Sequence, residues 1–217
     1  DPHMNSVTVI DYGIVNLGNI VRALEHVGAR VCVGSDPGAV SQADRVILPG
    51  VGAFASGMAE LKSRDLDNAL KEAALAGTPL LGICLGMQLL LDYSEENGGA
   101  MGLGLIAGNV IEMPRWGADG LRKRKVPHIG WNALQYPPNQ SHWQDSCLAM
   151  IHQGEFCYFI HSYMTIPENP AHILAQCDYE GLVLNAAISQ DNITGLQFHP
   201  ERSGPEGLKI LECFVRS

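Results

Sequence analysis

Residues 79–91 read Pro-Leu-Leu-Gly-Ile-Cys-Leu-Gly-Met-Gln-Leu-Leu-Leu and join two elements with opposite side-chain preferences. Residues 80–83 are a short apolar run after a proline, which predicts a buried strand, whereas residues 85–93 carry the long unbranched side chains that favour a helix. Cys84 lies at the corner, and Gly82 and Gly86 leave room for a tight turn. The pattern G-x-C-x-G therefore predicts a nucleophile elbow with cysteine in the place of serine.

Such an elbow places Cys84 at a helix N-terminus, where backbone N–H groups and the helix dipole favour the thiolate. The N–H of Leu85 would point toward an oxyanion formed when Cys84 attacks a carbonyl. The pattern alone also fits a buried core cysteine between two glycines, because free cysteine is among the most buried residue types. Features elsewhere in the chain are needed to choose between the two.

The composition bounds the class of protein. The 217 residues suit one domain of the larger sort with a single core. A net charge of −9 argues against nucleic acid or an anionic membrane as the main partner, and we interpret the short basic run at 122–125 as a solvated or interface loop. No apolar segment approaches membrane-spanning length and no signal-peptide pattern opens the chain, so we expect a cytosolic protein. We take residues 1–3 as an expression-tag remnant and 4–217 as the domain.

Cysteine usage gives little support for a metal or a disulfide framework. The six cysteines are scattered and include no C-x-x-C pair. We expect no metal and no cofactor.

Predicted strands and helices alternate in the first half of the chain. We expect strands at 7–10, 30–33, 45–48 and 80–83, and helices at 16–28, 56–77 and 85–93. This alternation predicts a single α/β domain with a mixed, mainly parallel sheet and helices on both faces. Later apolar runs, at 105–106, 110–111, 128–134, 156–164, 172–176, 183–189 and 193–198, predict an antiparallel extension of that sheet. A last helix is expected at 205–215, capped by Ser203.

The loop Pro49-Gly50-Val51-Gly52-Ala53-Phe54 follows the third predicted strand. Ligands of open α/β sheets bind at this end of the strands. Because glycine-rich loops can turn N–H groups toward an anion, Gly50, Val51 and Gly52 are candidates for the second half of an oxyanion hole. A plain strand-to-helix turn is the commoner meaning of such a loop.

The segment Gly195-Leu196-Gln197-Phe198-His199-Pro200-Glu201 supplies the missing acid–base groups. A residue before proline is pushed toward extended geometry, so His199 and Glu201 should project to the same side. With Cys84 as nucleophile, His199 as base and Glu201 as orienting acid, the three roles of an acyl-transfer triad are filled. In isolation, the same three letters would suit a strand-capping histidine and a solvated acid.

Taken together, G-x-C-x-G-x-Q and the distant F-H-P-E resemble the class I, triad-type glutamine amidotransferases. Further landmarks at 11–17, 48–54, 128–132, 158–163 and 197–203 fall in family order and resemble the glutaminase subunits of imidazole glycerol phosphate synthase. The resemblance implies a flavodoxin-like amidotransferase fold and hydrolysis of glutamine through a Cys84 thioester. The freed ammonia would pass to a (β/α)₈-barrel cyclase partner in histidine biosynthesis.

The resemblance also implies roles for individual residues. The glutamine pocket would be lined by Gln88, Glu96, Ser162 and Tyr163, although Glu95 adjoins Glu96 and leaves that match open. Trp131, Tyr158 and Arg202 would meet the cyclase, and Arg202 stands where lysine is common. Without the resemblance, Trp131 would be a core aromatic residue and Tyr158 a strand residue. The loop at 49–52 would hold its oxyanion donor turned away until the partner is loaded.

Two other functions stay open on the sequence. One is a paralogous glutaminase that serves another synthase, such as one that amidates a sugar nucleotide. The other is a non-hydrolytic binding module, either a pseudoenzyme or a protein like the DJ-1 group, which also carries cysteine on an elbow. DJ-1-like proteins place histidine directly after that cysteine, whereas Leu85 follows Cys84 here.

Overall fold

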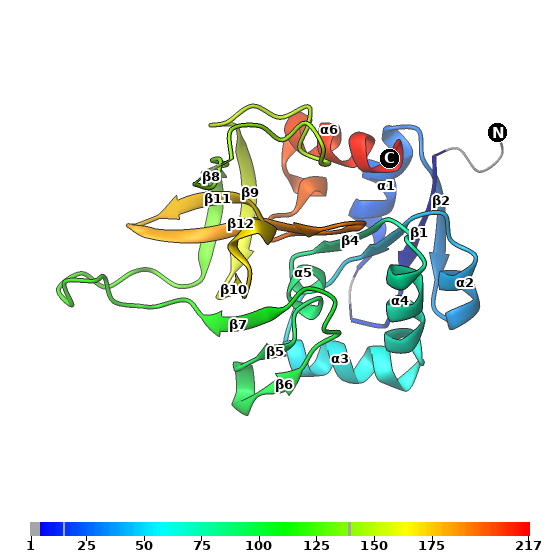
Figure 1. The fold of residues 1–217 in the computed structure, drawn as a ribbon, viewed down its shortest axis with the longest axis horizontal. Helices are drawn as coiled ribbons and strands as arrows, with labels where there is room; N and C mark the ends of the chain where they lie inside the picture. The colour runs from blue at the N-terminus through cyan, green and yellow to red at the C-terminus, as the bar shows by residue number, and fades with distance from the viewer. Residues whose placement is uncertain (1–4, 15, 139) are drawn as a thin grey trace.

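A computed structural model describes residues 5–14, 16–138 and 140–217, so the proposed tag remnant lies outside the described residues. Within these ranges, seven strands form the main sheet in the order β11-β12-β13-β4-β3-β1-β2 (Figure 1). Five of them, β1 (Ser6–Ile10), β2 (Arg30–Gly34), β3 (Val46–Leu48), β4 (Leu80–Ile83) and β13 (Ile193–Leu196), run parallel to their neighbours in this group. The strands β11 (Ile173–Tyr179) and β12 (Leu182–Gln190) add an antiparallel edge. The predicted fold class is confirmed.

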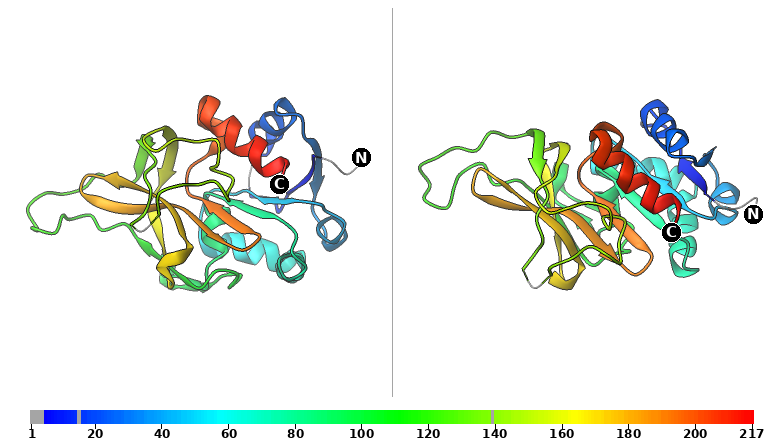
Figure 2. Two further views of the ribbon diagram at one scale, coloured as in Figure 1. Left: turned by 45° about the horizontal axis from the view of Figure 1, so that its top comes forward. Right: turned by 90° about the horizontal axis from the view of Figure 1, so that it is seen from above.

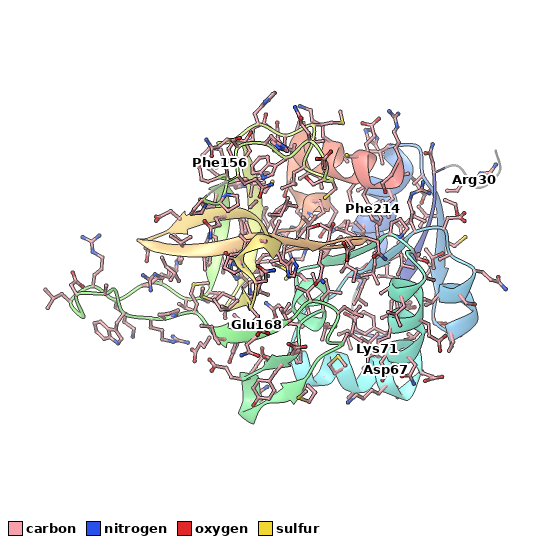
Figure 3. The ribbon with its side chains drawn as sticks, viewed as in Figure 1. Arg30, Asp67, Lys71, Phe156, Glu168 and Phe214 are labelled. Atoms are coloured by element: carbon pink, nitrogen blue, oxygen red, sulfur yellow. The ribbon has the colours of Figure 1, made fainter. Side chains whose placement is uncertain are left out.

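Helices cover both faces of this sheet. On one face lie α1 (Gly18–His26) and α6 (Gly204–Val215), which contact each other (Figures 1 and 2). On the other lie α2 (Pro37–Ser41), α3 (Phe54–Ser63), α4 (Leu66–Leu75) and α5 (Leu85–Leu89). Each face has its own apolar core: Ile20 and Phe214 pack on the first, where Phe214 points from α6 toward the sheet, and Met58 and Leu70 pack on the second (Figure 3).

Two smaller sheets depart from the predicted single extension. The strands β5 (Tyr93–Ser94), β6 (Ala100–Met101), β7 (Gly108–Glu112) and β10 (Tyr163–Pro167) form one, and β8 (His128–Ala133) pairs with β9 (Phe156–His161) in the other. The apolar run at 156–164 was expected to be one strand. It turns at Ser162, so its first part pairs with β8 and its second with β7.

Several predicted boundaries were wrong for local reasons. The helix expected at 56–77 is divided into α3 and α4 because Asp65 has a left-handed φ of 56°, and the helix expected at 85–93 ends at Leu89. Residues 105–106 are not a strand. Helix α2 was not among the predicted helices; Asp36 caps it, and the Asp36 side chain accepts a hydrogen bond from the Ala39 N–H group at 2.9 Å. Single-turn 3₁₀ helices occur at η1 (Glu96–Gly98), η2 (Pro170–His172) and η3 (Pro200–Arg202).

Residues 113–127 connect β7 to β8 and extend away from the body of the molecule (Figures 1 and 2). The basic run at 122–125 belongs to this projection but is not wholly solvated. Arg124 is buried, and its guanidinium donates to the carbonyl oxygens of Pro114, Tyr179 and Glu180. This side chain therefore anchors the base of the projection to the β11–β12 turn. None of the helices in the described ranges has the length and apolarity needed to span a bilayer.

Candidate active site

The corner between β4 and α5 is as tight as the sequence predicts. Cys84 adopts φ 56° and ψ −111°, a conformation that residues with a side chain rarely adopt. A Cβ atom on Gly86 would lie 1.8 Å from the Leu48 carbonyl oxygen, and one on Gly82 would lie 2.6 Å from the Gly86 carbonyl oxygen. Both flanking positions are thus restricted to glycine by neighbouring backbone.

Hydrogen bonds with β9 hold His199 in place at the end of β13. The His199 N–H donates to the Tyr158 carbonyl at 3.0 Å, and the Ser203 hydroxyl donates to the His199 carbonyl at 2.6 Å. The same hydroxyl accepts from the Tyr158 N–H at 3.0 Å. Ser203 is the N-cap residue of α6, as predicted, but its side chain makes no capping hydrogen bond because the hydroxyl is used in this link.

The structure brings the imidazole and the acid together. His199 Nδ1 and Glu201 Oε1 are 2.6 Å apart, and both side chains are about nine-tenths buried at 8% and 10% exposure. Because a carboxylate only accepts, Nδ1 carries the proton and Nε2 is the ring atom left for chemistry. Among the described residues, Nε2 has no hydrogen-bond partner. Burial alone would lower the pKa of His199, but interactions with the nearby Cys84 sulfur and with Glu201 outweigh it and raise the pKa to about 10.

The Cys84 sulfur opens into a cavity of about 370 Å³. The predicted substrate residues lie together in its wall: Gln88, Glu96, Ser162 and Tyr163. Glu96 rather than Glu95 lines it, since the Glu95 carboxylate turns away to accept from the Glu112 N–H at 2.7 Å. Burial, the largest influence, raises the pKa of Glu96. The cavity therefore combines a thiol, an amide and an acid at one site.

The loop at 49–52 borders both this cavity and a second hollow that contains the acid–base pair. His199 and Glu201 line this second hollow, of about 170 Å³, and Val51 belongs to the walls of both. The Gly50 carbonyl accepts the Leu85 N–H at 3.1 Å, so the predicted oxyanion donor is already occupied. The buried Tyr12 hydroxyl donates to the Pro49 carbonyl at 2.5 Å and holds the loop in this arrangement. Gly52, with φ 100°, supplies a position where the loop can turn.

Comparison with known proteins places this geometry in a family. The model of the family described as glutamine amidotransferase class-I matches residues 8–217. The chain belongs to the class I glutamine amidotransferases. Among curated relatives, the imidazole glycerol phosphate synthase subunit HisH 1 of Legionella pneumophila (strain Lens) is 44% identical over 98% of this chain and 100% of its own length. The subunit HisH of Methylococcus capsulatus is also 44% identical, over 98% of this chain and 97% of that protein.

Solved structures agree at the level of fold. A structure of PurLQS from Thermotoga maritima has a TM-score of 0.70 at 20% identity and covers 97% of both chains. A crystal structure of another glutamine amidotransferase has a TM-score of 0.68 at 15% identity, over 95% of this chain and 98% of that one. The predictions of a class I amidotransferase fold and of a glutaminase of the HisH type are confirmed.

This amidotransferase also exposes an apolar face on the β8–β9 pair. Trp131 is 54% exposed, which corrects the unaided interpretation of a core aromatic residue. It pairs with Tyr158 across the strands, and their rings meet edge to face at 6.0 Å. The Arg202 guanidinium lies 4.4 Å above the Tyr158 ring. Other exposed apolar side chains on these strands are Ile129, Phe156 and Ile160, and Figure 3 shows Phe156 at the rim of the molecule.

Sequence reasoning gave no role to four residues at the candidate site. Tyr12, Gln197 and the buried pair of His128 and His161 all lie in the landmark segments but were not singled out. Apart from the family landmarks, the available signal was a polar residue inside an apolar strand run, as at Gln197.

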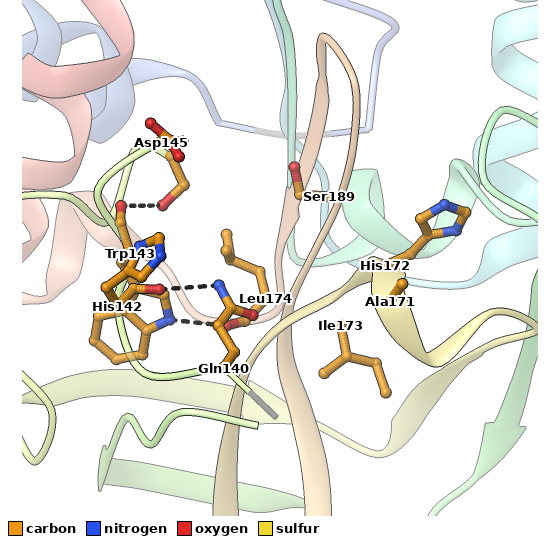
Figure 4. Close-up of a pocket in the computed structure, with 10 residues that line it drawn as sticks. Gln140, His142, Trp143, Asp145, Ala171, His172, Ile173, Leu174 and Ser189 are labelled. Atoms are coloured by element: carbon orange, nitrogen blue, oxygen red, sulfur yellow. Dashed lines mark hydrogen bonds between the residues drawn. The ribbon is translucent and has the colours of Figure 1, made fainter. Parts of the chain in front are cut away.

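The cavity drawn in Figure 4 does not belong to the site. It has a volume of about 200 Å³ and lies between residues 140–146, η2 and β12. Polar groups in its wall are hydrogen-bonded to one another: Trp143 Nε1 donates to the Leu174 carbonyl at 2.8 Å, and Gln140 Nε2 donates to the His142 carbonyl at 3.0 Å. The Trp143 bond fastens the 140–146 segment to β11 at the edge of the main sheet, and the Gln140 bond lies within the segment.

Proposed function

We propose that this protein hydrolyses L-glutamine to glutamate and ammonia through a Cys84 thioester and passes the ammonia to the cyclase subunit HisF. HisF would use the ammonia to complete imidazole glycerol phosphate and release AICAR in histidine biosynthesis, in the cytoplasm. The observation that carries the proposal is the strained Cys84 elbow beside a buried His199–Glu201 pair, opening into a cavity walled by Gln88 and Glu96.

In the first half of the reaction, the Cys84 sulfur attacks the side-chain amide carbon of glutamine and forms a C–S bond. His199 Nε2 donates its proton to the amide nitrogen as the C–N bond breaks, and ammonia leaves. In the second half, a water molecule attacks the thioester carbon and gives a proton to His199 while the sulfur departs as thiolate. Glu201 keeps Nδ1 protonated throughout, so Nε2 alone exchanges protons.

Each half passes through an oxyanion that needs hydrogen-bond donors. The Leu85 N–H supplies one only after the Gly50 carbonyl releases it, and a turn of residues 50–52 would offer others. We therefore propose that docking of the partner on the Trp131, Tyr158 and Arg202 face reorganises this loop. The same movement would unite the sulfur cavity with the hollow that contains His199.

The test replaces the nucleophile. In the presence of HisF, Cys84→Ala should reduce ammonia release from glutamine at least about a thousandfold, because no thioester can form. The matched control is Cys32→Ala at an exposed cysteine, which should retain activity. Ammonia release by Cys84→Ala at the wild-type rate would overturn the proposal.

A second experiment separates the alternatives. A glutamine-like alkylating agent should label Cys84 in the complex, whereas a non-hydrolytic binding module would leave Cys84 unlabelled. Recovery of a synthase other than HisF in a pull-down would favour the paralogous glutaminase.

A further inference from the structure

Gln197 follows β13 and has a fully buried side chain, 1% exposed. The preceding residue, Leu196, accepts the Cys84 N–H at 2.7 Å through its carbonyl, so the strand delivers Gln197 directly beside the elbow. The Gln197 amide nitrogen lies 3.9 Å from the Cys84 sulfur, within the range of N–H···S hydrogen bonds. Its amide oxygen accepts from Gln88 Nε2 at 3.3 Å. A buried amide needs such partners, and here they are the sulfur and a substrate-pocket residue.

The surrounding groups determine which end of the Gln197 amide faces the sulfur. Gln88 also points toward the Tyr163 carbonyl at 3.4 Å, and a backbone carbonyl can only accept, so the Gln88 atom at this position is nitrogen. That nitrogen uses its second hydrogen toward Gln197, which must therefore present oxygen to Gln88. The other end of the Gln197 amide, the N–H donor, consequently faces Cys84.

We propose that Gln197 is a further catalytic residue of the glutaminase, whose amide N–H donates a hydrogen bond to the Cys84 thiolate and holds the sulfur toward the glutamine pocket. The inference rests on the proposed function and adds a residue to it. A hydrogen bond to an ionised acceptor is about twice as strong as one to a neutral group, so this contact favours the thiolate over the thiol. Through its oxygen, Gln197 also links the position of the sulfur to that of Gln88.

The experiment titrates the Cys84 thiolate in the full-length protein. The rate of Cys84 alkylation by iodoacetamide is followed against pH by mass spectrometry of the Cys84 peptide. In Gln197→Met, which keeps the length but not the donor, the midpoint should rise by about one pH unit. With HisF present, kcat for glutamine should fall about tenfold while KM changes less than about twofold. The other titratable groups facing the sulfur, His199 and the Tyr12 hydroxyl, are unaltered in this variant.

Two further variants sharpen the test. Gln197→Glu keeps the acceptor for Gln88 but replaces the N–H donor with a carboxylate, whose negative charge repels the thiolate. Its alkylation midpoint should therefore rise further than that of Gln197→Met. This variant also tests the inference if Gln197→Met does not fold. Gln176→Met, on β11 with its amide bonded to Asn185, is the matched control and should leave midpoint and kcat unchanged. Unchanged midpoints in both Gln197 variants would overturn the inference. Because the titration reads the sulfur itself, it stands apart from the outcome of the Cys84→Ala turnover test.

Discussion

At the scale of the residue, the Tyr12 hydroxyl holds the loop at 49–52, which we propose as the oxyanion loop, in its present arrangement. It is wholly buried and binds the Pro49 carbonyl, and it lies so close to Gly50 that a Cβ there would be 2.1 Å from its oxygen. Burial first, and then the nearby Cys84, raise the pKa of Tyr12, so it stays a protonated donor. The loop is therefore held by a group next to the nucleophile.

Removing that hydroxyl should release the loop. We expect Tyr12→Phe to raise glutaminase activity without HisF several-fold, because the arrangement in which Gly50 occupies the Leu85 N–H loses one anchor. The variant should also lose about 1 kcal/mol of stability with the hydrogen bond. Steady-state ammonia release and thermal unfolding measure the two effects. Tyr136→Phe is a distant matched control, and partner-free activity equal to wild type in Tyr12→Phe would contradict the expectation.

Residue identities could be predicted where chemistry restricts the choice. Cys84, His199 and Glu201 stand out because each motif has a reactive type beside glycine or proline, and the structure places the last two 2.6 Å apart. Gln197 could not be identified in the same way. Its role depends on contact with Gln88, which lies 109 positions away in the chain.

At the scale of the element, a chain of hydrogen-bonded side chains, called the relay below, joins β8 to β9 and β10, which line the proposed glutamine pocket. His161 Nδ1 must donate to the Tyr163 carbonyl at 2.9 Å, which leaves its Nε2 as an acceptor. His128 Nδ1 therefore donates to His161 Nε2 at 2.9 Å, and His128 Nε2 accepts from Asn132 at 3.4 Å. Both rings are neutral in this relay, and one tautomer is assigned to each.

This relay predicts a loss of stability in mild acid. Burial is the main cause that lowers the pKa of both histidines to about 4. At His128, the Glu180 carboxylate partly opposes this shift. At His161, the Tyr163 carbonyl opposes it, whereas His128 and His199 lower the pKa further. The unfolded chain binds protons below about pH 6.5, whereas the folded rings do not until about pH 4. Stability is thus fully present above pH 6.5 and lost toward pH 4, on the order of 2 kcal/mol for each ring at pH 5.

Urea unfolding at pH 7 and pH 5 measures this dependence. His128→Gln should reduce the difference in free energy of unfolding between the two pH values, and the exposed His26→Gln should not. An equal pH dependence in wild type and His128→Gln would show that the buried pair does not cause it.

Elements with strong periodicity were predictable, and those decided by a single backbone angle were not. The parallel strands and α1 follow from their apolar spacing. The break between α3 and α4 depends on one left-handed residue, Asp65, for which the sequence offers no glycine as a signal. The two small sheets depend on which partner each half of residues 156–164 meets, and partner choice is a tertiary property.

At the scale of the whole molecule, the exposed apolar face of the β8–β9 pair lies next to the candidate active site. His199 and Tyr158 share a backbone hydrogen bond, so β9, which carries part of this apolar face, also positions the imidazole. We propose this face as the docking site of the partner, because exposed apolar side chains gathered on one face are typical of interaction sites. A partner bound to this face would be separated from His199 only by the backbone of β9.

Trp131→Ala should weaken the complex with HisF at least about tenfold, because a large aromatic side chain at the centre of an interface is the usual hot spot. The midpoint of thermal unfolding should change little, since the indole is half exposed and packs mainly on Tyr158. Isothermal titration with HisF measures the affinity. Trp116→Ala, at an equally exposed tryptophan on the 113–127 projection, is the matched control. Wild-type affinity in Trp131→Ala would place the interface elsewhere.

The backbone at position 84 sets a limit on engineering. With φ at 56° and ψ at −111°, glycine would have the least backbone strain at this position, yet the cysteine side chain is the proposed nucleophile. Selection for thermal stability alone would thus favour glycine at position 84 and remove the thiol. Stabilising substitutions that preserve the reactive sulfur must therefore lie outside this turn.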